Sequence, residues 1–347
     1  MSINRIKAFL CGSGVEGMQN ETIATELLRL IQSNRSPSSS DAPLRVAYLG
    51  TATYDIAQDG VTQLRQLTQR GCDVRWVRVA DPAVTTLEAA DRQFIEEHAD
   101  AVLVSGGNTL YAVRRWVETG VAAALRVAAA RGCVLSGGSA GAICWCTSGH
   151  SDSADPASAQ LPMLLRAAGR EADAAAAEKD VSSSADGSFQ YIRVGALGLL
   201  PGLLCPHYDR TEERGHTCRY VDVGKMVKRH PTERCVAIDH LAAVVLPGDG
   251  SYRVVAPADA QRQLPPPDVV AAASPDEQIP VNMRPGVFVL EVDRQGLLHR
   301  WRVPEKGKVT DLFHEPTGPL VRDPFEMYYA MMNPTPSTER LVRPGAK

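Results

Sequence analysis

A short glycine-rich segment holds the residue best suited to covalent chemistry. Residues 137–141 read Gly-Gly-Ser-Ala-Gly, a G-x-S-x-G pentapeptide centred on Ser139. The apolar run 133–135 precedes it and the apolar run 142–145 follows it, so the pentapeptide is expected at a turn from a strand into a helix. Flanking glycines allow a serine at such a turn to project its hydroxyl from the end of a sheet. We predict that Ser139 is a nucleophile; the alternative is a structural glycine-rich turn.

A nucleophilic serine needs a base, and the base needs an acceptor that orients it. His207 is distinguished among the histidines because it follows the apolar run 203–205 and a proline that restricts the backbone. The alternative is a structural histidine at the end of a strand. His150 is a rival that lies closer to the serine in sequence, within the polar run 147–153. Sequence geometry alone leaves the carboxylate open among four residues: Asp152, Asp155, Asp209 and Asp239.

Composition excludes several classes of function. The chain has 347 residues, of which 44% are hydrophobic and 22% charged, as in ordinary globular proteins of one or two domains. A net charge of -3 gives no electrostatic case for binding nucleic acid or an anionic membrane. The eight cysteines form no C-x-x-C pair, so we expect no metal and no other cofactor. No apolar run is long enough for a signal peptide or a membrane span, and a cytoplasmic location is expected.

The first half of the chain alternates apolar runs with stretches of helical periodicity. Strands are predicted at 6–11, 44–49, 74–79, 101–104 and 134–135, and helices at 21–32, 61–70, 87–98, 110–118 and 122–131. Near-continuous apolar strands between helices indicate an α/β fold with a mostly parallel sheet and helices on both faces. The glycine turns after the first, fourth and fifth strands should meet at the carboxyl edge of that sheet, where function gathers.

The remainder divides into segments of different composition. Residues 1–253 are predicted to form the catalytic domain, interrupted at 154–188 by an alanine-, serine- and charge-rich surface insertion. Residues 254–347 form a C-terminal extension of unknown role, in which 287–292 and 297–303 are predicted to pair as a hairpin.

Three motifs in a fixed order add a family resemblance. They are SGGNTLYAV at 105–113, GGSAGAICW at 137–145 followed by SDS, and LLPGLLCPHYDRTEER at 199–214. Together they resemble the peptidase E family of serine peptidases, which includes aspartyl dipeptidases and, more distantly, cyanophycinases. The resemblance extends over roughly residues 5–250 and implies a fold like that of class I glutamine amidotransferases (flavodoxin-like), with the serine at a nucleophile elbow.

The resemblance also implies the roles of site residues. It places the nucleophile at Ser139, the base at His207 and the acid at Asp152, with Asp155 as the alternative beside the insertion. The backbone amides of Gly107 and Ala140 would donate to the oxyanion.

The implied substrate is a short acidic peptide, cleaved without a metal. Asn108 of the GGN motif is expected to contact it, and Arg210 and Arg214 are suited to bind an aspartyl carboxylate in a two-pronged manner. The alternative for both arginines is that they are solvated surface charges. A small peptide is the expected partner, with a homodimer as an open oligomeric state.

The chain departs from the family pattern at one further point, and two other functions compete. Asp239-His240-Leu241 stands where relatives often have an acidic residue and glycine, which affects the expected substrate contacts. The first competitor is an α/β-hydrolase esterase, which predicts a base near the C-terminus, at His299 or His314. The second is a binding module without catalytic activity on the same fold.

Overall fold

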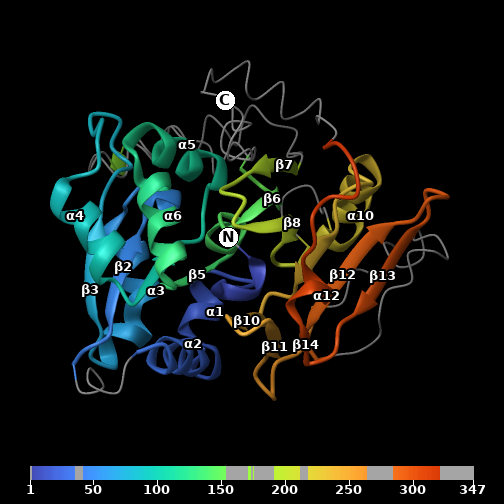
Figure 1. The fold of residues 1–347 in the computed structure, drawn as a ribbon, viewed down its shortest axis with the longest axis horizontal. Helices are drawn as coiled ribbons and strands as arrows, with labels where there is room; N and C mark the ends of the chain where they lie inside the picture. Colours follow the sequence, from blue (N-terminus) through green and yellow to red (C-terminus); the bar gives the residue numbers. More distant parts are fainter. Residues whose placement is uncertain are drawn as a thin grey trace.

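The computed structural model describes most of the chain as two sheets flanked by helices. The described residues are 2–35, 42–153, 171–172, 175, 191–211, 218–263 and 284–320. Asp155, Arg214 and nearly all of the predicted insertion therefore lie outside them. Figure 1 shows β2 and β3 with helices α3 to α6 on one side of the molecule, and β12 and β13 with α10 on the other.

The first sheet has eight strands in the order β14-β11-β10-β1-β5-β4-β2-β3. The strands predicted in the first half of the chain are β1 (Lys7–Cys11), β2 (Arg45–Leu49), β3 (Asp73–Val77), β4 (Ala101–Val104) and β5 (Val134–Gly138). These five pair in parallel. Three further strands continue the sheet in antiparallel pairing: β10 (Ala243–Pro247), β11 (Ser251–Val255) and β14 (Lys306–Lys308). The sheet is thus mixed, with a parallel half that carries the predicted strands.

Both faces of the parallel half are buried under helices. Side chains on one face pack with α2 (Glu21–Ser33) and α3 (Ala57–Gln69), and those on the other face pack with α5 (Thr109–Thr119) and α6 (Val121–Arg131). Alternate residues of each strand join opposite clusters; Phe9 faces the first pair of helices, for instance, and Leu10 the second. Burial on both faces explains why these strands read as near-continuous apolar runs.

Local signals fix where the helices begin and end. Asn108 caps α5, because its side-chain oxygen accepts a hydrogen bond from the amide of Tyr111 at 2.9 Å. Gly120 ends that helix with a φ of 86°. The shorter helical elements are η1 (Ile3–Arg5), α1 (Val15–Gln19), η3 (Thr51–Thr53), α4 (Ala89–Gln93), the π-helix η4 (Phe94–His98), α7 (Ala140–Ile143) and α12 (Val309–Leu312).

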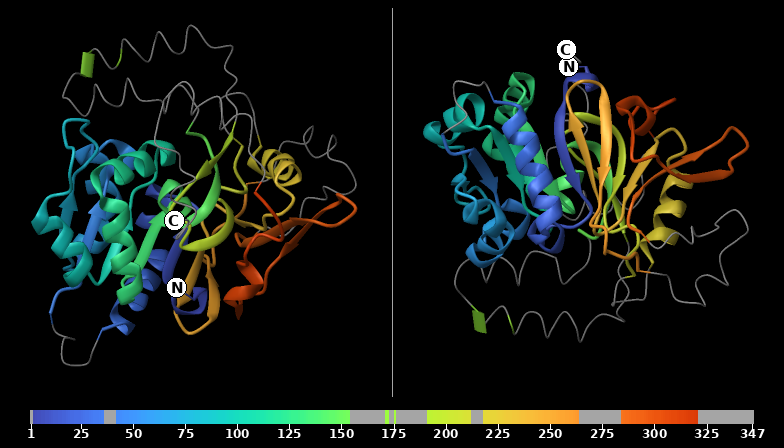
Figure 2. Two further views of the ribbon diagram at one scale, coloured as in Figure 1. Left: turned by 45° about the horizontal axis from the view of Figure 1, so that its top comes forward. Right: turned by 90° about the horizontal axis from the view of Figure 1, so that it is seen from below.

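A second sheet of six strands lies beside the first, in the order β13-β12-β9-β8-β6-β7. Its strands are β6 (Cys146–Ser151), β7 (Ile192–Gly195), β8 (Leu200–Cys205), β9 (Cys235–Ile238), β12 (Val287–Val292) and β13 (Leu298–Arg302), with α10 (Arg219–Arg229) packed against them. In both views of Figure 2 the orange β12–β13 hairpin lies on the opposite side from the blue and cyan strands.

Strand β6 takes up most of the polar run 147–153, for which the sequence indicated no strand. All six residues of β6 are buried. Its polar side chains find partners in the interior: Ser148 Oγ donates to Glu233 at 3.0 Å, and His150 Nε2 lies 2.8 Å from Asp222. Burial of polar groups is tolerated when they are hydrogen-bonded, and the local sequence does not reveal such distant partners.

Residues after 253 complete both sheets. Strand β12 pairs antiparallel with β9, and β14 pairs with β11. The predicted hairpin is confirmed as β12 paired with β13. The division at residue 253 therefore coincides with no break in either sheet. No helix in the described ranges is long and apolar enough to cross a membrane.

Candidate active site

Ser139 occupies a strained turn between β5 and α7. Its φ of 55° and ψ of -120° lie outside the regions that L-residues ordinarily adopt. The turn is held because the amide of Ser139 donates to the carbonyl of Cys11 at 3.1 Å. It is also crowded: a Cβ at Gly141 would lie 2.2 Å from the carbonyl oxygen of Val104, so glycine is required there. The sequence motif thus folds into a bend that presents the serine hydroxyl.

His207 follows β8 and joins the two sheets. Its amide donates to the carbonyl of Gly12, which follows β1 in the first sheet, at 3.1 Å. The next amide, of Tyr208, donates to Ile238 at the end of β9 in the second sheet at 3.0 Å. His207 also has a positive φ of 51°. With its backbone held in this way, the Nε2 atom of His207 lies 2.8 Å from the Oγ atom of Ser139.

A second histidine and a glutamate extend this contact. The Nδ1 atom of His207 lies 2.7 Å from Nδ1 of His240, in the turn after β9. The Nε2 atom of His240 lies 2.6 Å from Oε2 of Glu16 on α1. The turn carrying His240 is fixed at its backbone, since its amide donates to Asp209 at 2.7 Å and its carbonyl accepts from Ser13 at 2.7 Å.

The predicted acid Asp152 lies elsewhere. It accepts a hydrogen bond from Nη2 of Arg219 at 2.5 Å and shares none with His207 in the described part of the chain. Strand β8 lies between β6 and β9, and Nδ1 of His207 contacts His240 in the turn after β9. In this geometry His240, and not Asp152, occupies the position beside Nδ1 of His207 that the third member of a triad would take.

The other carboxylates left open by the sequence also have separate partners. Asp209 accepts from the amides of His240 and Gln263. Asp239 accepts from the amide of Gly286 at 2.8 Å and forms an ion pair with Arg262. Neither carboxylate contacts His207 within the described residues.

The rival bases are likewise engaged away from Ser139. His150 is buried in β6, paired with Asp222 and stacked on Tyr191 with ring centroids 4.2 Å apart. His299 contacts Asp293 in the β12–β13 turn, and His314 contacts a backbone carbonyl. Of these candidates and His207, only His207 is brought to the serine.

The two backbone amides predicted to bind an oxyanion belong to the loop after β4 and to the start of α7. Gly107 adopts a φ of 115°, and a Cβ there would lie 2.3 Å from the carbonyl oxygen of Ala52. A Cβ at the preceding residue, Gly106, would lie 3.5 Å from Cβ of Ser139, so this loop borders the serine. Ala140 is the first residue of α7. The geometry thus brings both segments to the same edge as the hydroxyl.

The residues predicted to bind substrate differ in their surroundings. Asn108 is 2% exposed, and its side chain caps α5 and donates to the carbonyl of Ser153 at 3.2 Å. That structural use is distinct from its predicted contact with substrate. Arg210 has a side chain that is 36% exposed, and its Nη2 is 3.5 Å from Oε2 of Glu16.

Burial and neighbouring cations favour neutral imidazoles in this cluster. Burial, followed by the positive charges of Arg219 and Arg210, holds the pKa of His207 well below its usual range. Burial and Arg210 also lower the pKa of His240, although the Glu16 carboxylate opposes that shift. His207 therefore keeps a free lone pair into the acidic range, as a general base requires.

His240 and Glu16 were not predicted as site residues. The one signal for His240 was its position in Asp239-His240-Leu241, where relatives often have an acidic residue and glycine. Glu16 lies 224 positions from His240 in sequence, and no local pattern marks it.

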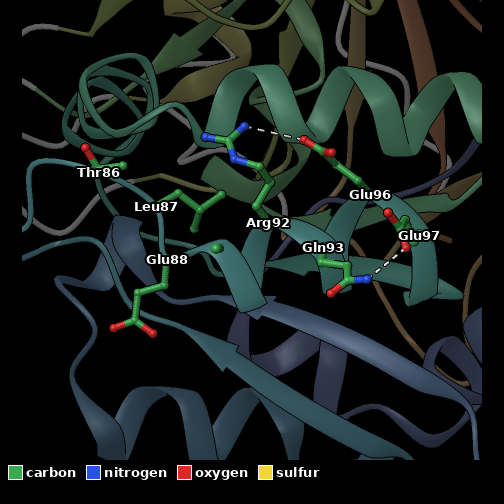
Figure 3. Close-up of a pocket in the computed structure, with 8 residues that line it drawn as sticks. Thr86, Leu87, Glu88, Arg92, Gln93, Glu96 and Glu97 are labelled. Carbon is green, nitrogen blue, oxygen red and sulfur yellow. Dashed lines mark hydrogen bonds and ion pairs between the residues drawn. The ribbon is translucent and has the colours of Figure 1, made fainter.

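A surface pocket shown in Figure 3 is separate from this cluster. Residues 86–89 and four side chains of α4 and η4 line it. Four of its polar side chains pair with one another: Arg92 with Glu96 at 3.4 Å and Gln93 with Glu97 at 3.1 Å. The described residues also contain no group of three or more histidine, cysteine or acidic side chains placed to hold a metal ion.

Comparison with known proteins gives the chain its family. The model of Peptidase family S51 matches residues 9–254. The uncharacterized peptidase YgaJ of Bacillus subtilis (strain 168) is 28% identical over 204 residues, which are 58% of this chain and 69% of that protein. A crystal structure of a peptidase from an acI-B1 Actinobacterium is 17% identical, covers 76% of this chain and 93% of its own, and has a TM-score of 0.46.

A further relative has a different kind of name. The G2/mitotic-specific cyclin-1 of Trypanosoma brucei brucei is 30% identical over 357 residues, 99% of this chain and 98% of that protein. This name describes the trypanosomal protein and carries no activity over to this chain. The family match covers most of the chain and includes Ser139, His207 and His240. The chain therefore belongs to peptidase family S51.

Proposed function

We propose that the protein is a serine peptidase that hydrolyses short peptides, dipeptides with an N-terminal aspartyl residue in particular. The observation that carries this proposal is the 2.8 Å contact between Oγ of Ser139 and Nε2 of His207 at a strained turn, in a chain of a peptidase family. A serine within hydrogen-bond reach of a neutral imidazole is the arrangement that activates a hydroxyl for attack on a carbonyl.

The proposed reaction is acyl transfer in two steps. His207 accepts the proton from Ser139 as Oγ attacks the scissile carbonyl, and the amides of Gly107 and Ala140 stabilise the oxyanion. The leaving amine takes the proton from His207, and water then hydrolyses the acyl-enzyme by the same route. In this proposal the turn at Ser139 acts as a nucleophile elbow on an amidotransferase-like core. His240 takes the position that a Ser-His-Asp triad would give to Asp152, because it holds Nδ1 of His207.

The preference for an acidic substrate rests on Arg210. Its backbone amide donates to the carbonyl of His207 at 2.9 Å, so the residue is fixed beside the base. Its side chain is partly exposed and contacts Glu16 only at 3.5 Å. A guanidinium in this position can exchange that weak contact for a two-pronged bond to a substrate carboxylate.

A dipeptide panel tests the proposal. Asp-X substrates should be hydrolysed, while β-Asp-X and non-acidic dipeptides should be turned over far more slowly. Preference for β-Asp-X would instead indicate a cyanophycinase-like specificity, and turnover of nitrophenyl esters alone would favour an esterase. The Ser139→Ala protein should be inactive. Ser136→Ala, which removes a buried hydroxyl from the same strand, is the matched control and should remain active.

Labelling with a fluorophosphonate separates an enzyme from a binding module. The probe should modify Ser139 in the wild-type protein and leave Ser139→Ala unmodified. A folded wild-type protein that is neither labelled nor active on the panel would favour a binding function on this fold.

A further inference from the structure

Four side chains form a continuous line of short contacts at the site. From one end, Oγ of Ser139 lies 2.8 Å from His207, His207 lies 2.7 Å from His240, and His240 lies 2.6 Å from Glu16. The two histidine rings use both of their nitrogens in this line. Its members come from the turns after β5, β8 and β9 and from α1, so the fold assembles it from distant parts of the chain.

One arrangement of protons satisfies every contact with both rings neutral. A neutral imidazole has one N–H donor and one acceptor, and a carboxylate only accepts. Glu16 therefore requires the proton of His240 to be on Nε2, which leaves Nδ1 of His240 as an acceptor. That acceptor requires the proton of His207 to be on Nδ1, and Nε2 of His207 then accepts from Ser139. The carboxylate thus selects the tautomers of both rings.

We propose that His240 and Glu16 are positioning residues that act through His207 as a two-part replacement for the acid of a catalytic triad. This inference rests on the proposed function, because it assigns a role within the same serine hydrolysis. His240 holds the tautomer and orientation of His207, and Glu16 supplies the negative charge one ring further out.

The proton movements balance within this line. As the Oγ–carbon bond forms, the proton of Ser139 passes to Nε2 of His207, and the carbonyl π electrons move onto the oxyanion. The imidazolium charge of His207 is then stabilised through its Nδ1–H bond to His240, whose Nε2–H is polarised toward Glu16. The proton on His207 then passes to the leaving nitrogen as the carbonyl re-forms and the C–N bond breaks. Water later attacks the acyl-enzyme and gives its proton to His207 by the same route.

Charged groups around the two histidine rings determine whether protonation of the rings is favoured or disfavoured. The groups that face them are Arg210 and Arg219, which disfavour protonation, and Glu16 and Asp209, which favour it. Glu16 is the exposed member, with 64% of its side chain accessible, whereas the side chain of His240 is 11% exposed. The anion can therefore be altered at the surface with little disturbance of the core, which makes it the best position for a test.

The main variant is Glu16→Gln, which removes the charge at nearly constant size. We expect kcat to fall about tenfold, because the developing imidazolium loses stabilisation. KM reports separately on Arg210, which loses its ion pair with Glu16 in this variant. The acid limb of the pH profile should move to lower pH, since loss of an anion lowers the pKa of the rings. Glu21→Gln removes an exposed carboxylate from α2 and is the matched control, with no expected change in either quantity.

Variants at His240 test whether Glu16 acts through the ring. His240→Asn places an oxygen near the former Nδ1 and can still accept from His207, so it should retain far more activity than His240→Ala. The alanine variant should lose about a thousand-fold or more in kcat, the scale expected when a base loses its orienting group. In the His240→Asn background, Glu16→Gln should have no further effect on the acid limb, because the link between them is gone.

The readout that does not depend on the substrate is the rate of fluorophosphonate labelling of Ser139 and its pH dependence. Equal labelling rates and an unmoved acid limb in wild type and Glu16→Gln would overturn the inference, as would a wild-type serine that is not labelled. If the wild type is labelled and the variants are slower, but Asp-X is not hydrolysed, the proposed substrate is wrong and the role of Glu16 stands. Nitrogen NMR gives a direct check: a His240 ring protonated on Nδ1 instead of Nε2 would contradict it.

Discussion

Two buried histidines in this protein contact carboxylates at similar distances, yet their surroundings differ. His150 lies within β6, 2.8 Å from Asp222, and its ring is stacked on Tyr191. His240 lies in a turn, 2.6 Å from Glu16, and its other nitrogen contacts His207. The first pair is enclosed between a strand and α10; the second leads to a serine at a strained turn. A histidine paired with a carboxylate therefore indicates catalysis only when its other ring nitrogen leads to a reactive group.

The contrast between the two histidines depends first on Ser139 being the nucleophile that His207 activates. Ser139→Ala should lower kcat for Asp-X dipeptides by about a million-fold while leaving the thermal melting curve unchanged, because it removes one hydroxyl from a turn. Steady-state kinetics and circular dichroism provide the measurement. Near-normal turnover by a folded Ser139→Ala protein would mean that another residue is the nucleophile.

Replacement of the two histidines should separate their roles. His207→Ala should reduce kcat nearly as much as loss of the serine, and the double variant should be little worse than either, because residues that act as one unit are not additive. His150→Ala, assayed beside it, should retain turnover once folded. The reverse result, an inactive His150→Ala with an active His207→Ala, would exchange the two assignments.

The buried pair of His150 and Asp222 should instead contribute to the stability of the fold. His150→Ala removes a buried ring stacked on Tyr191 and leaves Asp222 without that partner, so the free energy of unfolding should fall by about 3 kcal/mol. Urea denaturation followed by circular dichroism measures the change. An unchanged midpoint would show that the interior of β6 tolerates loss of the ring.

Asp152 provides a smaller contrast with the site. Because its carboxylate accepts from Arg219 and not from His207, Asp152→Asn should change kcat by less than about tenfold. A loss of a thousand-fold or more would show that Asp152 acts as the triad acid after all, through a rearrangement of the segment after β6. Steady-state kinetics with the same dipeptides distinguish these outcomes.

Acidification should affect the two regions in different ways. The pKa of His207 and that of His150 both lie below their ordinary range, mainly through burial. The acid limb of the kcat/KM profile should therefore fall below pH 6.5, because neutral His207 persists there. For stability, the unfolded chain binds protons below pH 6.5 that the folded rings do not, so the free energy of unfolding should decrease as pH falls through that range. His150→Phe should reduce the loss of stability without moving the kinetic limb.

The parallel half of the first sheet could be predicted from sequence because its signals are local. Strands such as β4 are apolar throughout, and the helices between them show regular apolar spacing. The second sheet lacked such signals. Strand β6 carries Ser148 and His150 inside the protein, and only their contacts with Glu233 and Asp222 make that burial favourable. Pattern analysis cannot supply partners that far away in sequence.

The site residues also differ in whether local sequence indicates them. Ser139 was indicated by its glycines, and the family motifs placed His207, because each is marked by its immediate neighbours. The resemblance implied Asp152 as the acid, but in the structure Asp152 contacts Arg219 while Nδ1 of His207 contacts His240. Recognition of His240 required the strand order of the second sheet, which places β9 beside β8.

The contact between Asp239 and Gly286 has a consequence for synthesis of the protein. The amide of Asp239 donates to the carbonyl of Gly286 at 3.0 Å, and the amide of Gly286 donates to the carboxylate of Asp239 at 2.8 Å. The turn that carries His240 thus depends on a strand encoded long after the serine and both histidines. During translation, Ser139, His207 and His240 are all synthesised before Gly286 can fix this turn. Until β12 has been made, the edge of β9 that pairs with it stays open. Peptidase activity should therefore appear only once the ribosome has released the segment beyond Gly286, which delays hydrolysis until translation of the domain is nearly finished.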